Sequence, residues 1–104
     1  MEVPEYINEV RLFVSKEYDI PESEISGHKR VRDIVKARFI TVYLIKVITG
    51  LQFKVISQNL FDSNDHYRSR YAFSELKNMM IVDQSLKQEI DLIKQKALKV
   101  LPKW

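Results

Sequence analysis

Hydrophobic residues recur along the chain at steps of three and four positions, whereas strict two-residue alternation is absent. The first such stretch runs from about Pro4 to Tyr18, and Pro4 suits the first turn of a helix. Its apolar stripe consists of Ile7, Val10, Val14 and Tyr18. This spacing predicts an amphipathic helix, followed by a connector over residues 19–26.

The most apolar segment runs from about Asp33 to Thr49. One of its faces carries Ile34, Ala37, Thr41, Leu44 and Ile48, and the other faces carry Val35, Phe39, Val42 and Val47. A helix that is apolar nearly all round belongs at the centre of a small bundle. Gly50 follows this segment, where a glycine can end the helix in a left-handed conformation.

Three further helices complete the predicted pattern. The first fits about Gln52–Leu60, and the second fits about Asp65–Met80, after a turn at residues 62–64. The last begins near Asp83 and has a stripe at steps of four and three: Leu86, Ile90, Ile93, Ala97 and Val100. This stripe indicates either a helix that packs on the body of the domain or a short coiled-coil seam through which two copies associate weakly. We favour packing, because the seam would span barely two heptads.

The pattern therefore predicts an all-α fold, a compact bundle of about five to six helices that forms one domain over residues 1–104. The chain has no cysteine, which excludes disulfides and thiolate metal sites. Its longest apolar stretch, residues 39–53, is broken by Lys46 and Gly50 and is too short to span a bilayer. The acidic N-terminus lacks the apolar segment of a signal peptide. We expect a cytoplasmic protein without a membrane partner.

The two helices around the turn at residues 62–64, preceded by a long apolar helix, are typical of a helix-turn-helix. In that motif the second helix enters the major groove of DNA with its N-terminal residues. Its buried side is expected to carry Ala72, Phe73, Leu76 and Met80. Its outward side is then expected to carry Tyr67, Tyr71, Ser74 and Asn78, flanked by Arg68 and Arg70.

Charge is unevenly distributed along the chain. Residues 1–24 carry seven acidic and two basic side chains, whereas residues 25–82 carry ten basic and four acidic ones. The basic part includes a loop, Gly27–Arg32, with Lys29, Arg30 and Arg32. Such a segment can be the electrostatic footprint of a polyanion or simply a solvated surface.

The segment Ser26–Arg38 reads SGHKRVRDIVKAR. It resembles part of the C-terminal DNA-binding domain of DnaA, the bacterial replication initiator, in which a basic loop ending in an arginine precedes a long helix with a similar Val/Arg pattern. Asp65-His66 stands where that family has its Arg-Asp-His-Thr-Thr signature. The order of elements also matches from about Tyr6 to about Ile93, so the resemblance covers most of the chain.

The resemblance implies a fold related to Trp repressor and a set of DNA contacts. The arginine of the family's basic loop reaches the minor groove, a role that would belong to Arg32. The family's Asp-His pair helps to read the major groove, although Asp65 equally suits the N-terminus of a helix as a favourable charge. Arg38 matches a basic position near the DNA. The residues expected to contact DNA are Lys29, Arg30, Arg32, Arg38, Asn64, Asp65, His66, Tyr67, Arg68 and Tyr71.

Several signature positions differ from the family pattern. Asp62-Ser63 replaces a glycine pair, with one residue inserted, and Asn64 replaces the signature arginine. Tyr67 and Arg68 replace the two threonines, and Ser69 occupies a position that is usually apolar. We therefore expect a target sequence other than the family's ordinary one.

These observations predict sequence-specific binding of double-stranded DNA by a DnaA-related accessory or regulatory protein of replication or transcription. The alternative is a protein–protein interaction module that keeps the fold without DNA binding, because outward tyrosines and arginines also suit a protein interface. No Gly-rich Lys-Ser/Thr loop occurs, so we expect no ATPase activity. The two distant histidines and the lack of a nucleophile–base set predict no metal, cofactor, small-molecule substrate or enzymatic activity.

Overall fold

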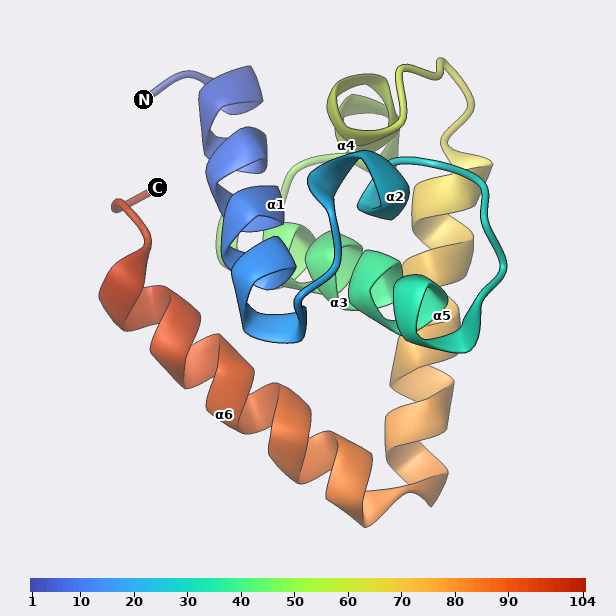
Figure 1. Cartoon of the computed structure of the whole chain (residues 1–104). Coiled ribbons are helices and arrows are strands. Elements are labelled where there is room, and N and C mark those ends of the chain that lie inside the picture. The colour runs from blue at the N-terminus through green and yellow to red at the C-terminus, as the bar shows by residue number, and fades with distance from the viewer.

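The computed structural model describes all 104 residues and contains helices but no strands. The helices are α1 (Val3–Tyr18), α2 (Glu22–Ile25), α3 (Arg32–Thr49), α4 (Phe53–Leu60), α5 (Tyr67–Val82) and α6 (Gln84–Val100). The predicted all-α fold is therefore confirmed. In Figure 1, α3 crosses the middle of the molecule, and it contacts α1, α2, α4 and α5.

The core forms around α3, as the hydrophobic pattern predicts. Ile40, Leu44 and Ile45 are fully buried in it, and the stripe of α1 packs against them through Val10 and Val14. α3 ends at a residue with a φ of 70°, which is the expected left-handed glycine. No helix has the length and apolar content that crossing a membrane requires.

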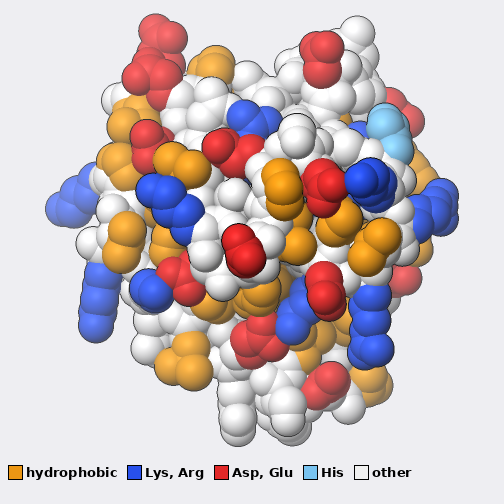
Figure 2. Space-filling model, viewed as in Figure 1, with side chains coloured by type: hydrophobic (Ala, Val, Ile, Leu, Met, Phe, Trp, Pro, Cys, Tyr) orange, Lys and Arg blue, Asp and Glu red, His pale blue; other side chains and the backbone are white.

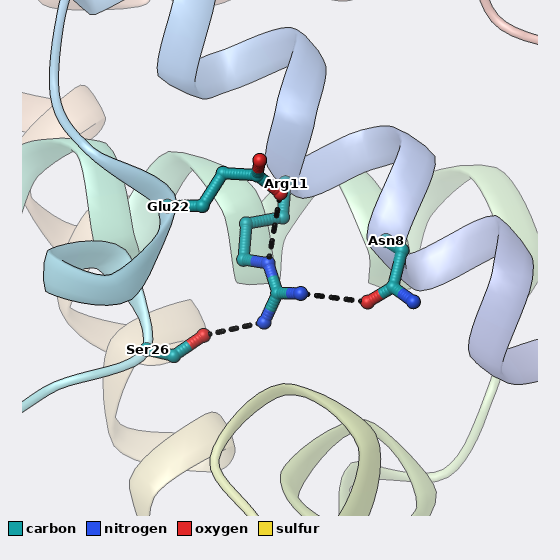
Figure 3. Close-up of polar contacts among 4 residues, drawn as sticks. All are labelled: Asn8, Arg11, Glu22 and Ser26. Carbon is teal, nitrogen blue, oxygen red and sulfur yellow. Dashed lines mark hydrogen bonds and ion pairs between the residues drawn. The ribbon is translucent and has the colours of Figure 1, made fainter.

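The segment expected to be a connector contains a helical turn, α2, which the sequence pattern does not reveal because four residues are too few to show a period. Arg11 of α1 fixes this turn at both of its ends (Figure 3). Its guanidinium donates to Ser26 Oγ at 2.8 Å, to Asn8 Oδ1 at 2.7 Å and to Glu22 Oε1 at 3.4 Å. The residues that precede the basic loop are thus held against α1.

Helices α4 and α5 form the predicted helix-turn-helix, and they contact each other directly. Ser57 and Ser69 are both fully buried, and their hydroxyl oxygens lie 2.6 Å apart across the two helices. Asp62 in the turn has a left-handed φ of 52°. α5 begins at Tyr67, two residues later than the pattern predicts, because Asp65 precedes the helix and His66 is its N-cap residue.

Helix α6 packs on the body of the domain, which is the alternative that its apolar stripe favours. Leu86, Ile90 and Ala97 are buried, whereas Val100 at the end of the stripe is exposed. Polar bonds add to this docking, since Glu89 of α6 accepts hydrogen bonds from Tyr18 Oη at 2.6 Å and Lys36 Nζ at 2.9 Å. The chain ends lie on the same side of the molecule in Figure 1.

Candidate nucleic-acid interface

A groove of about 590 Å³ separates the basic loop from helix α5. The loop, α3 and α5 all contribute to its walls. Its lining residues are His28, Arg30, Val35, Arg38, Phe39, Tyr67, Arg68, Tyr71 and Ala72. The fold therefore brings the two segments that the sequence singled out, the loop and the second helix of the helix-turn-helix, to the two sides of one groove.

Three cationic side chains of the loop are exposed to solvent. Arg30 and Arg32 take part in no ion pair or side-chain hydrogen bond. Lys29 Nζ lies 2.8 Å from Glu24 Oε1, and this hydrogen bond raises the pKa of Lys29. An exposed pair of this kind contributes little to stability, so Lys29 can exchange its partner for another anion. All three cations are available to a polyanion.

Two tyrosines are the exposed aromatic part of the groove wall on α5. Tyr67 is 63% exposed and Tyr71 is 47% exposed, as expected for outward positions. Their rings stack with centroids 6.0 Å apart at 23°, because the residues are one helical turn apart. The rings of Tyr71 and Phe39 of α3 pack edge to face, with centroids 6.1 Å apart. The wall is thus an aromatic surface next to cations.

Arg38 lines the groove, but most of its side chain is buried, and its predicted contact with DNA stays a prediction. This side chain is only 7% exposed, and it donates to three backbone carbonyl oxygens. The acceptors are Ile25 at 2.9 Å, Lys29 at 3.0 Å and Glu24 at 2.9 Å. Burial lowers the pKa of Arg38. Most of its hydrogen-bonding capacity is therefore used inside the protein, at the end of α2 and the start of the loop.

Arg68, expected to flank the outward face of α5, is only partly exposed. Its Nη2 donates to the carbonyl oxygen of Gly27, and its Cζ lies 3.9 Å from the centroid of the Phe61 ring. Burial lowers the pKa of Arg68, and the nearby charge of Arg38 lowers it further. The Arg68 side chain thus bridges α5, the end of α4 and the basic loop.

The three signature positions before α5 are exposed. Asp65 Oδ1 accepts a hydrogen bond from the Tyr67 backbone N–H at 2.9 Å, so this carboxylate satisfies the start of the helix. Asn64 Oδ1 accepts from Gln58 Nε2 at 3.3 Å. His66 makes no side-chain hydrogen bond and is open to solvent. Asp65 therefore has the structural role of an acidic residue at a helix N-terminus, and its contact with DNA stays a prediction.

The surface around the groove is of mixed charge but rich in cations. Figure 2 shows Lys and Arg side chains, a histidine and apolar side chains together on the side where the basic loop and α5 lie in Figure 1. Acidic side chains are interspersed among them. No group of three or more His, Cys, Asp or Glu side chains is placed to hold a metal ion.

The fold and this groove define the class of protein: a helix-turn-helix domain with a basic loop beside its second helix. The profile of a family described as "Bacterial dnaA protein helix-turn-helix" matches residues 7–68. The chain therefore belongs to this family, which confirms the resemblance seen in the sequence.

Curated relatives support the same assignment. The chain is 36% identical over 90 residues to the chromosomal replication initiator protein DnaA of Streptococcus agalactiae (serotype Ia), Streptococcus uberis and Streptococcus thermophilus. These matches cover 86% of this chain but only 20% of each relative, so the chain spans about a fifth of their length. No solved structure matches the chain significantly.

Proposed function

We propose that this chain binds double-stranded DNA selectively, with the basic loop at the minor groove and the start of α5 in the major groove. The observation that carries this proposal is that both segments line one groove of about 590 Å³. A duplex presents its two grooves on either side of a phosphate backbone, so adjacent protein segments can reach both. Membership of a bacterial DnaA helix-turn-helix family supports the same function.

In this proposal the exposed cations of the loop provide affinity, and the exposed side chains at the start of α5 provide selectivity. Lys29, Arg30 and Arg32 are exposed and supply the charge that attracts phosphates. We assign Arg32 to a narrow, A·T-rich minor groove because it matches the arginine of the family's basic loop. Tyr67 and His66 stand at the first turn of α5, the part that reads base edges in this class of motif. Arg68 does not read a base in this proposal, because its guanidinium is turned toward Gly27 and Phe61.

We infer a regulatory or accessory role in replication or transcription for this domain. These 104 residues contain no Gly-rich Lys-Ser/Thr loop, so the role proposed for them needs no ATP hydrolysis. The altered signature at Asn64, Tyr67 and Arg68 supports a target other than the family's ordinary one. Self-association through α6 is weak in this proposal, because most of its apolar stripe already packs on the domain.

Selection from random duplexes tests the proposal. Wild-type protein should enrich one sequence class, and Arg32→Ala should weaken binding and reduce the preference for A·T-rich flanks. Lys99→Ala removes the same charge from the last turn of α6, away from the groove, and serves as the control. Enrichment of no sequence together with weak, salt-insensitive binding would favour the protein-interaction alternative.

A further inference from the structure

Four backbone carbonyl oxygens, two in α2 and two in the basic loop, accept hydrogen bonds from two guanidinium groups. Arg38 binds those of Glu24, Ile25 and Lys29, and Arg68 binds that of Gly27. Neither arginine is paired with a carboxylate. A guanidinium has five N–H donors, so these two side chains can satisfy several carbonyl oxygens at once.

The two arginines hold the loop in different ways. Arg38 approaches from α3 and closes the end of α2, so it joins neighbouring parts of the chain. Arg68 approaches from the first turn of α5 and is 41 residues away from its acceptor in sequence. Its other face lies on the Phe61 ring, which is nearly buried at the end of α4. Arg68 is thus the side chain that ties the loop to the helix-turn-helix.

We propose that Arg68 is a positioning residue that latches the basic loop to the helix-turn-helix before DNA is bound. This inference rests on the proposed function, since it concerns the same surface. With the latch closed, the loop cations are held at a fixed distance from the stacked tyrosines. Pre-ordering of this kind increases affinity because the loop loses less conformational entropy on binding. Arg68 therefore acts through Arg30 and Arg32 rather than through a base.

Arg70 provides a matched control two residues away on the same helix. It is exposed, and its Cζ lies 5.9 Å from the Phe53 ring without any contact to the loop. Arg68→Ala and Arg70→Ala remove the same charge from the same turn. A purely electrostatic role predicts similar losses for both, whereas the latch predicts that only Arg68→Ala changes the contribution of the loop.

A double-mutant cycle on duplex affinity separates the two roles. Arg30→Ala should weaken duplex affinity by some factor in the wild-type background. We expect this factor to be at least about threefold smaller in the Arg68→Ala background, because the effects of coupled residues are not additive. The same cycle with Arg70 should be additive within about twofold. Selection by Arg68→Ala should return the wild-type sequence with uniformly weaker binding. Additivity of Arg30 with Arg68, or relaxed selection at one base position, would overturn the latch.

Loop order in the free protein gives a second readout that needs no DNA. Backbone order parameters of residues 27–31 should fall in Arg68→Ala and stay unchanged in Arg70→Ala. If Arg68→Ala does not fold, Arg68→Lys replaces it with the same expectations, since an ammonium lacks the planar face that stacks on Phe61. Unchanged loop order contradicts the latch. Absence of duplex binding by wild type contradicts the proposed function instead, and the order parameters still decide the latch.

Discussion

At the residue scale, the buried hydroxyl groups of Ser57 and Ser69 join the two helices of the helix-turn-helix. Each is the other's partner at 2.6 Å, and neither is exposed to solvent. A buried polar group without a partner costs free energy, whereas removal of both partners can be nearly neutral. The pair therefore explains how a serine is accommodated where the family usually has an apolar residue.

We predict that Ser57→Ala and Ser69→Ala each lower the free energy of unfolding by about 1–3 kcal/mol. The double variant should lose clearly less than the sum of the two, because no unpaired hydroxyl remains. Urea unfolding of the four proteins measures this coupling. Strictly additive losses would show that the two hydroxyl groups do not depend on each other.

Arg38 should matter for stability, unlike the exposed arginines of the loop. Arg38→Ala leaves three carbonyl oxygens without their donor, and we expect a loss of about 1–3 kcal/mol in the free energy of unfolding. Arg30→Ala is the control, and its effect should stay within about 0.5 kcal/mol because the side chain is exposed. Equal losses in thermal or urea unfolding would show that Arg38 is not a structural residue.

The inward orientation of both arginines has a sequence signal in their helical position. Arg38 lies four residues after Ile34 and three before Thr41, on the face expected to be buried. Arg68 lies four residues before Ala72 and eight before Leu76, which are both buried. The acceptors of these arginines could not be predicted from the sequence, because they are backbone carbonyls of the short helix α2 and of the basic loop.

At the element scale, α6 is held by a polar cluster as well as by its apolar stripe. Glu89 is in contact with Tyr18 of α1 and Lys36 of α3, so one carboxylate links three helices. Partial burial raises the pKa of Glu89, but the hydrogen bonds from Lys36 and Tyr18 outweigh it and leave the pKa below its ordinary value. These bonds favour the charged form of the carboxylate.

This lowered pKa predicts a pH dependence of stability. A group whose pKa is lower in the folded protein stabilises the fold above its unfolded pKa, and that contribution is lost as pH falls through the folded value. Stability should therefore decrease below about pH 4.5, and Glu89→Gln should show a shallower decrease in this window. Urea unfolding at several pH values between about pH 3 and about pH 7 gives the free energy of unfolding of the wild type and of Glu89→Gln. Parallel curves would exclude a contribution from Glu89.

The five long helices could be predicted from the sequence to within about two residues at each end, because their apolar stripes are long, whereas the four-residue helix α2 could not. The pattern predicts the start of α5 two residues too early, because Asp65 and His66 cap the helix instead of belonging to it: His66 is the N-cap residue, and Asp65 accepts a hydrogen bond from the Tyr67 backbone N–H. The groove could not be predicted, because its walls come from three segments separated in the chain.

At the scale of the whole molecule, the central position of α3 sets the stability of the domain. Leu44 is fully buried, so Leu44→Ala should cost about 2–5 kcal/mol of unfolding free energy. Leu92→Ala makes the same change on α6 at a side chain that is 66% exposed, and it should cost less than about 0.5 kcal/mol. A loss below about 1 kcal/mol at Leu44 would mean that the core has a different centre.

At this scale, the exposed cations of the basic loop lie beside α5, and we predict that this surface binds duplex DNA. A salt titration of duplex affinity tests it most directly, because each phosphate contact contributes about −0.9 to the slope of log affinity against log salt. With Lys29, Arg30 and Arg32 engaged and the two inward arginines already bonded within the protein, we predict a slope of about −3. A slope near zero, or no binding at low salt, would contradict the account.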